Sequence, residues 1–581
     1  MGRFPFVCLA ALVGAFAAIM AVDNASTSFA NVIMACALGL PVMFALRVVV
    51  ERRLRGRGAG LALEIAGILL VAAYAWSVPS DCSKFTGMVW IRYGLLILGL
   101  HFAVAFAPCF AGADEAEYWH FNWRLFGRFA LTTLYSGVLY LGLAAALASS
   151  DKLFDLKVDA KRYAELWIVM AGLFHPLFFL SGVPPADRDP AAGPSYPNGL
   201  RAFAQFALAP LVVVYVAILY AYAVKIIVRW SWPHGWIAMP VSVLAVSGIL
   251  AALLLQPARN LDSERWARWY WKYFYKALAP LSVLLMLSIW RRESEYGFTE
   301  WRYYGMVMGV WLLATSLFYA FRPGASTRAI PASLSIICLL TVWGPWSVFS
   351  VSMASQRHRL VSTLQPDGLE NGLVAPAKGT LPPKEVEAVR SIVSHLIRTY
   401  GIESISDLLP KDLREKVASA YAGRNGFAGE YQATQQIVDF ITGGKAAAAK
   451  VAHHQQVLSV DLDLAGGLPV DGYARLYHAC ICPGQPEQTL GELSVRSPAG
   501  GAMPEFRSHG ERLDGAAVAA RIRAVEDSAA KGARKLAPSE MSASVVSVAH
   551  EWLVIIDKAS MRRVGGTPAT LTELDIYVLE K

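Results

Sequence analysis

The chain has 581 residues, of which 55% are hydrophobic and 17% are charged. Soluble proteins carry about 25% charged residues, so the composition excludes an ordinary soluble protein and indicates a polytopic membrane protein. The formal net charge is +9. Residues 1–353 hold 28 basic and 18 acidic side chains, whereas residues 354–581 hold 25 and 26. A nucleic-acid-binding domain needs a basic patch, and the near-neutral second half excludes nucleic acid as a partner.

Apolar runs of about 20 residues recur about eleven times before Ser355, and each is long enough to cross a ~30 Å hydrocarbon core. They predict a polytopic α-helical membrane bundle of about 11 spans in residues 1–355. A linker at 356–384 and a soluble α+β domain at 385–581 are expected to follow. The runs lie near 4–22, 29–50, 60–78, 88–110, 129–147, 166–180, 206–228, 236–255, 278–290, 304–321 and 331–351. A cleaved signal peptide is the alternative for residues 1–22.

Basic residues in the short loops predict the orientation of the chain in the membrane. The loop at 51–57 carries Arg52, Arg53, Arg55 and Arg57, which indicates a cytoplasmic loop. The loop at 151–162 has four basic residues, yet the count of spans places it outside the cytoplasm, which conflicts with the rule. Because the loop also has three aspartates, we give it less weight than the other loops. The count places the N-terminus in the cytoplasm. In a bacterium it predicts an inner-membrane protein with a periplasmic C-terminal domain.

Residues 265–276 interleave basic side chains with large aromatic ones, from Arg265 to Lys276. Such a pattern suits the headgroup region of a bilayer, either as an aromatic belt with positive anchors or as a site for anionic lipid. The belt is the favoured interpretation. The lipid bilayer is the expected environment in both cases.

The second half shows the periodicities of an α+β domain. Apolar residues recur at helical spacing over 385–400, and 408–421, 430–441 and 516–530 also predict helices. Strands are expected at 457–464, 473–482, 545–556 and 574–579. A linker rich in Gly and Pro covers 365–383.

Four ionisable residues lie inside the predicted spans, where such groups are costly and suggest function. They are Glu64, Arg92, His101 and His175, and His175 precedes Pro176 in mid-span. A polar pathway or proton relay is one hypothesis. The alternative, which is favoured, is that Glu64 and Arg92 snorkel to the interfaces while the histidines hydrogen-bond across the bundle.

No standard catalytic or metal signature is present. The chain lacks a P-loop, a G-x-S-x-G elbow, an H-E-x-x-H motif and a G-x-G-x-x-G turn after a strand, which disfavours an enzyme. His478, Cys480 and Cys482 alternate along a predicted strand, but a structural zinc site usually has four ligands. A buried strand is favoured there, and no metal or cofactor is expected.

Three short motifs occur in order near the boundary between the halves: YGFTEWRY at 296–303, GPWS at 344–347 and SQRHRL at 355–360. The series resembles a bacterial membrane family called domain of unknown function 4153. The resemblance covers about 278–360, continues loosely through 390–409, and departs at Trp301, where an Asn is expected. It implies a membrane fold and no activity.

The first motif also has a physical interpretation. Gly297 permits a sharp bend, and the hydroxyl of Thr299 is expected to cap the following helix. Glu300 and Arg302 are expected at the outer interface, paired with each other or with the C-terminal domain. The functional hypothesis is an external binding site built from Tyr296, Thr299, Glu300, Arg302 and Tyr303. The alternative is a capped turn and nothing more.

Three functions stay open at this stage. The first is a membrane protein with a transport- or lipid-related role. The second is an envelope sensor or assembly scaffold that its spans anchor and that binds an envelope protein. The third is a membrane enzyme that acts on lipid or cell-wall precursors. Few charges lie in mid-span, which favours anchoring slightly over transport, yet eleven spans are many for an anchor.

Overall fold

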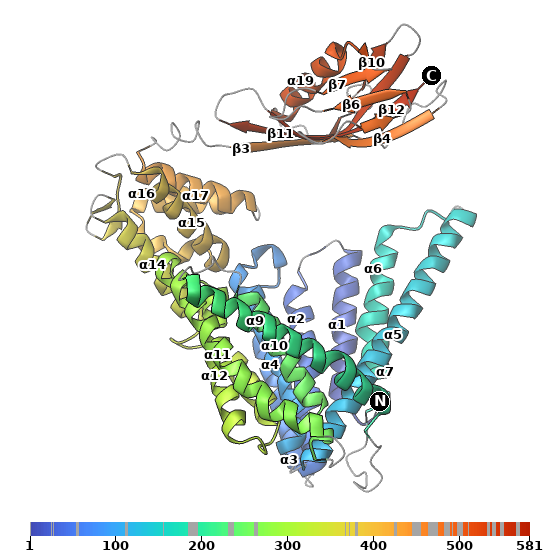
Figure 1. Ribbon diagram of the computed structural model, residues 1–581, viewed down its shortest axis with the longest axis vertical. Helices are drawn as coiled ribbons and strands as arrows, with labels where there is room; N and C mark the ends of the chain where they lie inside the picture. Colours follow the sequence, from blue (N-terminus) through green and yellow to red (C-terminus); the bar gives the residue numbers. More distant parts are fainter. Residues whose placement is uncertain are drawn as a thin grey trace. The chain divides into compact units, whose positions relative to one another are not determined.

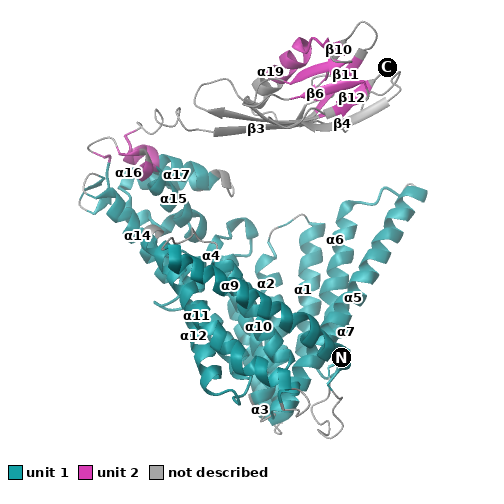
Figure 2. Ribbon diagram, in the orientation of Figure 1, with its two compact units in different colours: residues 1–375, 387–437 teal, residues 376–386, 438–581 magenta. Residues whose placement is uncertain are grey.

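The computed structural model divides the chain into two compact units, coloured separately in Figure 2. The first unit holds residues 1–375 and 387–437, and the second holds 376–386 and 438–581. Residues 387–437 thus belong to the same compact unit as the membrane half, and the division into domains at 385 stays a prediction. The structure describes residues 2–24, 26, 28–53, 57–110, 114–154, 156–183, 196–229, 237–260, 265–365, 368–370, 372–377, 381–422, 427–443, 455–462, 475–481, 488–490, 492–496, 504–508, 511–530, 535–536, 542–546, 551–564 and 570–580.

Nine helices of the described residues are long and apolar enough to cross a membrane. They are α1 Pro5–Asp23, α2 Ala30–Arg53, α3 Arg57–Ser77, α4 Gly87–Phe110, α5 Glu115–Phe154, the continuous helix α6–α7 over Ala160–Ser181, the continuous helix α8–α9 over Asn198–Arg229, α11 Arg265–Tyr296 and α12 Glu300–Phe321. Two apolar helices, α10 Ala238–Leu254 and α13 Ala329–Leu340, are shorter. All of them fall on predicted runs, and the count of about eleven spans stays a prediction.

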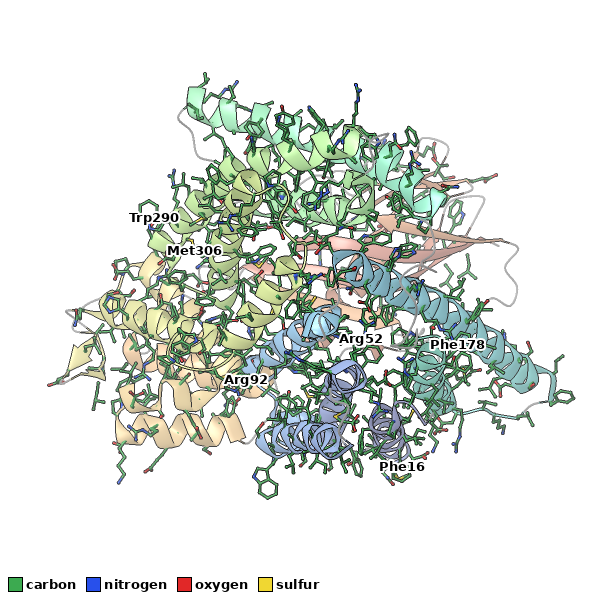
Figure 3. All side chains as sticks on the ribbon, turned by 90° about the horizontal axis from the view of Figure 1, so that it is seen from below. Phe16, Arg52, Arg92, Phe178, Trp290 and Met306 are labelled. Carbon is green, nitrogen blue, oxygen red and sulfur yellow. The ribbon has the colours of Figure 1, made fainter. Side chains whose placement is uncertain are left out.

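Large apolar side chains cover the outside of these helices. Phe16 and Trp290, which Figure 3 shows at the periphery of the helical part, are 65% and 59% exposed. A soluble surface rarely carries such a density of exposed Leu, Phe and Trp. In a bilayer these side chains contact lipid tails, which confirms a membrane protein.

The helices pack in two neighbouring groups (Figure 1). Helices α1 to α4 form one group, and α9 to α13 surround a core that is built on α11. Gly248 in α10 allows the close approach of α11, since an added Cβ would lie 2.2 Å from the ring of Phe274. The absence of a side chain at this position therefore sets the distance between the two helices.

Proline widens two of the helices. A π-helical segment, Val169–Phe174, precedes Pro176, and another, Ala204–Leu208, precedes Pro210. Proline has no N–H to donate, and its ring clashes with the carbonyl four residues earlier. A local π turn accommodates this mismatch without ending the helix. The mid-span Pro176 is thus accommodated by a π turn rather than by a break in the helix.

The predicted run at 331–351 is not one helix, and this expectation was wrong. Helix α13 ends at Leu340, and Gly344 then adopts φ +90 before Pro345. Ser347 caps the next helix, α14 Val348–Leu364, by accepting the N–H of Ser350. Glycine tolerates the left-handed turn and proline cannot continue the helix, so a hydropathy window misses the break.

Three helices follow α14 and confirm the predicted helical segments: α15 Pro383–Tyr400, α16 Lys411–Ala422 and α17 Phe427–Ile441. The apolar stripe of α15, including Val393, Leu396 and Ile397, is fully buried. Between α15 and α16, Arg357 of α14 donates to Ser404 O at 3.0 Å and pairs with Asp407. These contacts fix two short 3₁₀ helices, Ile402–Ser404 and Ser406–Leu408, against α14.

Strands make up most of the described residues of the second unit. One sheet has the order β4-β12-β11-β3-β9, with β10 on β11, and a four-stranded antiparallel sheet has the order β5-β6-β7-β8. The strands are β3 Gln455–Leu462, β4 Arg475–Ile481, β5 Gln488–Leu490, β6 Leu493–Arg496, β7 Glu505–Ser508, β8 Glu511–Arg512, β9 Lys535–Leu536, β10 Ser542–Val546, β11 Glu551–Val564 and β12 Thr570–Glu580. Helix α19 covers Ala516–Ala530, as predicted. The strand expected at 545–556 is instead a pair, in which Val545 lies opposite Trp552.

Candidate functional site

The turn between α11 and α12 lies against α14. Gly297 has φ +67, and an added Cβ would lie 3.1 Å from both Ser355 Oγ and Gln356 Nε2. The N–H of Phe298 donates to Ser355 Oγ at 2.9 Å, and Gln356 Nε2 donates to Phe298 O at 2.6 Å. The first and third motifs are thus hydrogen-bonded to each other, and glycine is required at 297 for its conformation and for space.

Glu300 is the buried acid of this junction, with only 3% of its surface exposed. Its carboxylate accepts a hydrogen bond from the Tyr400 hydroxyl, and its Oε2 lies 3.2 Å from His395 Nε2. It is also the first residue of α12, where the helix dipole favours negative charge. Burial and the hydrogen bond to Glu300 raise the pKa of Tyr400, so the phenol stays a donor.

The other residues of the turn mostly bond to backbone. Arg302 donates to Gly297 O at 2.7 Å, and the Tyr303 hydroxyl donates to Trp346 O at 2.6 Å. Thr299 occupies the N-cap of α12, but its side chain makes no capping hydrogen bond, so that expectation was wrong. Its carbonyl accepts the Tyr303 N–H instead. The side chain of Tyr296 lies outside the described residues.

A cavity of about 340 Å³ opens beside this junction, within the first unit. Helices α12, α14 and α15 and the turn before α12 line it. Its walls hold three guanidinium groups, one imidazole, three hydroxyls and one amide. They are Thr299, Arg302, Gln356, Arg359, Ser391, Ser394, His395 and Arg398.

Sequence reasoning nominated only Thr299 and Arg302 of these eight residues. The four from α15, at 391, 394, 395 and 398, follow helical spacing opposite the apolar stripe. That polar face was visible in the sequence, although a solvated face was its ordinary explanation. Gln356 and Arg359 stood inside the SQRHRL motif without an assigned role.

Two of the four intramembrane candidates have separate partners. Glu64 is buried and pairs with Arg47 at 3.3 Å, and Arg47 also contacts Glu51 at 3.3 Å. Arg92, labelled in Figure 3, lies over the ring of Phe349 at 5.2 Å. Neither residue lines the cavity described next.

The two histidines share a second cavity, of about 310 Å³, between α1, α2, α4, α5 and α7. His175 Nε2 lies 3.2 Å from Thr133 Oγ1, and His101 Nδ1 lies 2.7 Å from Ile97 O. Most of the lining is apolar, and Asn122 adds its amide. His101 and His175 thus line one cavity, and neither Glu64 nor Arg92 is among its lining residues.

The first three turns of α11 divide the basic-aromatic segment between two faces. The rings on one face, including Trp271 and Tyr275, are fully buried in the core of the α9–α13 group. The other face is exposed and follows helical spacing. It consists of Arg265, Arg268, Trp269, Lys272, Tyr273 and Lys276, and we call it the α11 stripe.

Among the residues that the structure describes, no three His, Cys, Asp or Glu side chains are grouped so that they could hold a metal ion. The side chains of His478 and Cys480 and all of Cys482 lie outside that part. The structure therefore does not test the metal hypothesis for this strand, and the buried strand stays the favoured prediction.

Fold and junction together define a multi-pass membrane protein in which extramembrane helices are hydrogen-bonded to the ends of membrane helices. The chain belongs to the family described as "Domain of unknown function (DUF4153)", whose model matches residues 7–371. This confirms the resemblance carried by the three motifs.

One relative is an uncharacterized protein, PM1469, of Pasteurella multocida (strain Pm70), which is 25% identical over 341 residues. The match takes in 57% of this chain and 55% of that protein, so the chain covers about half of its relative. No solved structure matches the chain.

Proposed function

We propose that this is a bacterial inner-membrane protein with a lipid-related role, which binds anionic phospholipid headgroups through the α11 stripe. Its C-terminal residues are placed in the periplasm. The observation that carries the proposal is the separation of α11 into a buried aromatic face and an exposed face of cations and rings.

The length of α11 supports a headgroup location for the stripe. Its 32 residues extend about 48 Å, whereas a bilayer measures about 40–45 Å with its headgroups. The apolar part, 277–290, lies between Lys276 and Arg291 and rises about 21 Å. The hydrocarbon core is ~30 Å thick, so the adjoining turn of each flank reaches into it while its long cationic side chains extend outward to the headgroups. The stripe therefore lies at headgroup level, at the end of α11 remote from the Gly297 turn.

The chemistry of the stripe matches anionic lipid. Residues 265–276 contain four basic side chains and no acidic one. Trp269 and Tyr273, 56% and 42% exposed, are the ring types that prefer the interface. The amines of Lys272 and Lys276 lie 5.3 and 6.0 Å from the Tyr273 ring centre, which directs both charges along the exposed face.

Lipid retention tests the proposal. The purified chain would be placed in nanodiscs of phosphatidylcholine with and without phosphatidylglycerol, and bound lipids counted by native mass spectrometry. Each cation near an anionic surface contributes about 1 kcal/mol, so Lys272→Gln with Lys276→Gln should weaken retention by about 2 kcal/mol, or roughly thirtyfold.

A second pair of exposed lysines provides the matched control. Lys152→Gln with Lys157→Gln removes the same charge outside the stripe and should leave retention unchanged. If both double variants lost the same amount of lipid, only net charge would matter; if both retained as much lipid as the wild type, the stripe would not bind it. Either result would contradict the proposal.

An envelope scaffold is the second candidate, and the junction favours it. Glu300 contacts Tyr400 and His395, and Arg357 pairs with Asp407, so α15 and the segment that leads to α16 are fixed to α12 and α14. In-cell crosslinking from exposed positions of α16 would test it: a single recurrent envelope protein supports a scaffold, and none contradicts it.

A further inference from the structure

We propose that the cavity between α12, α14 and α15 is a binding site for a phosphate group. This ligand and this site are independent of the lipid contact proposed for α11. The cavity of about 340 Å³ falls within the size range of small-molecule sites, which begins near 300 Å³.

The charge of the walls points to an anion. Arg302, Arg359 and Arg398 contribute three guanidinium groups, and none of the eight lining residues is acidic. Two acids contact lining residues from outside the lining: Glu300 contacts His395 and also Tyr400, and Glu293 interacts with Arg302. Arginine is the side chain best suited to multidentate binding of oxyanions.

The arrangement of donors favours phosphate over carboxylate. The three guanidinium groups come from three different helices, α12, α14 and α15, and therefore approach the cavity from different directions. A carboxylate presents two oxygens in one plane, whereas a phosphate presents up to four at tetrahedral directions. Hydroxyls of Thr299, Ser391 and Ser394 supply the further donors that such an anion uses.

The junction holds the walls of the cavity in place before a ligand arrives. Glu300 contacts the His395 ring through one nitrogen, and Arg302 is tied to Gly297 O. Gln356 is held by its bond to Phe298 O. Because these side chains are already ordered, binding has less conformational entropy to overcome. This arrangement also gives the first and third sequence motifs a shared role.

The site lies at the N-terminal end of membrane helix α12, so its phosphate has two possible sources: a free phosphate compound or a phospholipid headgroup. Two arms of one experiment separate them. In the first, the full chain in detergent is titrated with inorganic phosphate and its thermal unfolding followed. In the second, the chain is placed in phosphatidylglycerol nanodiscs and retained lipid is counted, with the Lys272→Gln/Lys276→Gln variant alongside to remove lipid bound at α11.

Arg359→Gln and Arg398→Gln are the test variants, and Lys416→Gln is the control. Arg398 is exposed, so its substitution should leave folding unchanged, and Lys416 is an exposed cation of α16 outside the cavity. Each test variant should weaken binding by about tenfold in whichever arm binds, because each removes one charge-assisted contact. The control should bind as the wild type does.

Saturable binding in either arm, weakened by the arginine variants alone, supports the proposal and identifies the source. Three results would overturn it: no saturable binding in either arm, equal affinities for Arg398→Gln and Lys416→Gln, or acetate that binds as tightly as phosphate.

Discussion

The two ends of α11 use the same kinds of side chain in different ways. At its start, arginines, lysines and rings form an exposed stripe on one helix. At its end, the turn after Tyr296 contributes to a cavity where arginines from three helices converge. The first arrangement suits a diffuse anionic surface, and the second suits one discrete anion.

Burial distinguishes the two ends better than charge does. Both are basic, yet among the residues that the structure describes a buried acid with two specific partners, Glu300, is found at the second end. A stripe needs no such acid because water and headgroups solvate its cations. A cavity needs fixed walls, and the buried carboxylate supplies them. Stability measurements should therefore respond at one end and not at the other.

The largest expected effect is that of Glu300→Ala. Loss of the carboxylate leaves the Tyr400 hydroxyl without its acceptor and the His395 ring without its charged neighbour in a partly buried site, at an expected cost of about 2–4 kcal/mol. Thermal unfolding in detergent, followed by tryptophan fluorescence, would measure it. Glu415→Ala on exposed α16 and Lys272→Ala in the stripe should each stay within about 0.5 kcal/mol. An equal loss for Lys272→Ala would erase the contrast between the ends.

Gly297→Ala should have the next largest effect. The φ of +67 is strained for any residue with a Cβ, and that Cβ would lie 3.1 Å from Ser355 Oγ, so we expect a loss of about 1–2 kcal/mol in the same assay. Gly94→Ala is the control, because it lies within α4 and an added Cβ meets nothing within 4 Å. That substitution should be neutral or slightly stabilising. A neutral Gly297→Ala would show that the turn does not depend on its glycine.

The smallest effect concerns Asp407, which Arg357 holds by a hydrogen bond that keeps its pKa below 3.8. A lowered folded-state pKa gives stability that is present above pH 3.8 and lost as the pH falls through the folded-state value. The side chain is 60% exposed, so Asp407→Asn should cost less than about 1 kcal/mol at pH 7. Unfolding curves of variant and wild type should converge in acid, with Glu415→Gln as the control for loss of a carboxylate. A difference that persists at low pH would contradict an electrostatic origin.

Local patterns predicted local structure well. The helical periodicity of 516–530 matches α19, and the apolar stripe of 385–400 matches the buried face of α15. Family resemblance identified the motifs around Gly297 and Ser355 as belonging together. Both kinds of signal depend on short stretches of sequence, which is why they succeeded.

Contacts between distant residues could not be predicted. Glu300 and Tyr400 are separated by 100 positions, and no sequence pattern around either residue indicates that the two are in contact. The sequence offered Arg302 or the C-terminal domain as partners of Glu300. The second alternative is the one that forms, because His395 and Tyr400 of α15 lie within the expected domain at 385–581, although the two residues themselves were not identified. Hydropathy also missed the break at Gly344, because the flanking residues are apolar on both sides of the turn.

The central claim is that the α11 stripe and the phosphate cavity lie on opposite sides of the membrane, with the cavity outside. Labelling of single cysteines with a membrane-impermeant maleimide in spheroplasts tests it most directly, in a background where all seven native cysteines are replaced. Arg398→Cys and Arg268→Cys place the thiol at exposed positions of the two ends. Arg398→Cys is predicted to react in intact spheroplasts and Arg268→Cys only after lysis. Labelling of both from the same side, or of Arg268→Cys alone from outside, would contradict the account.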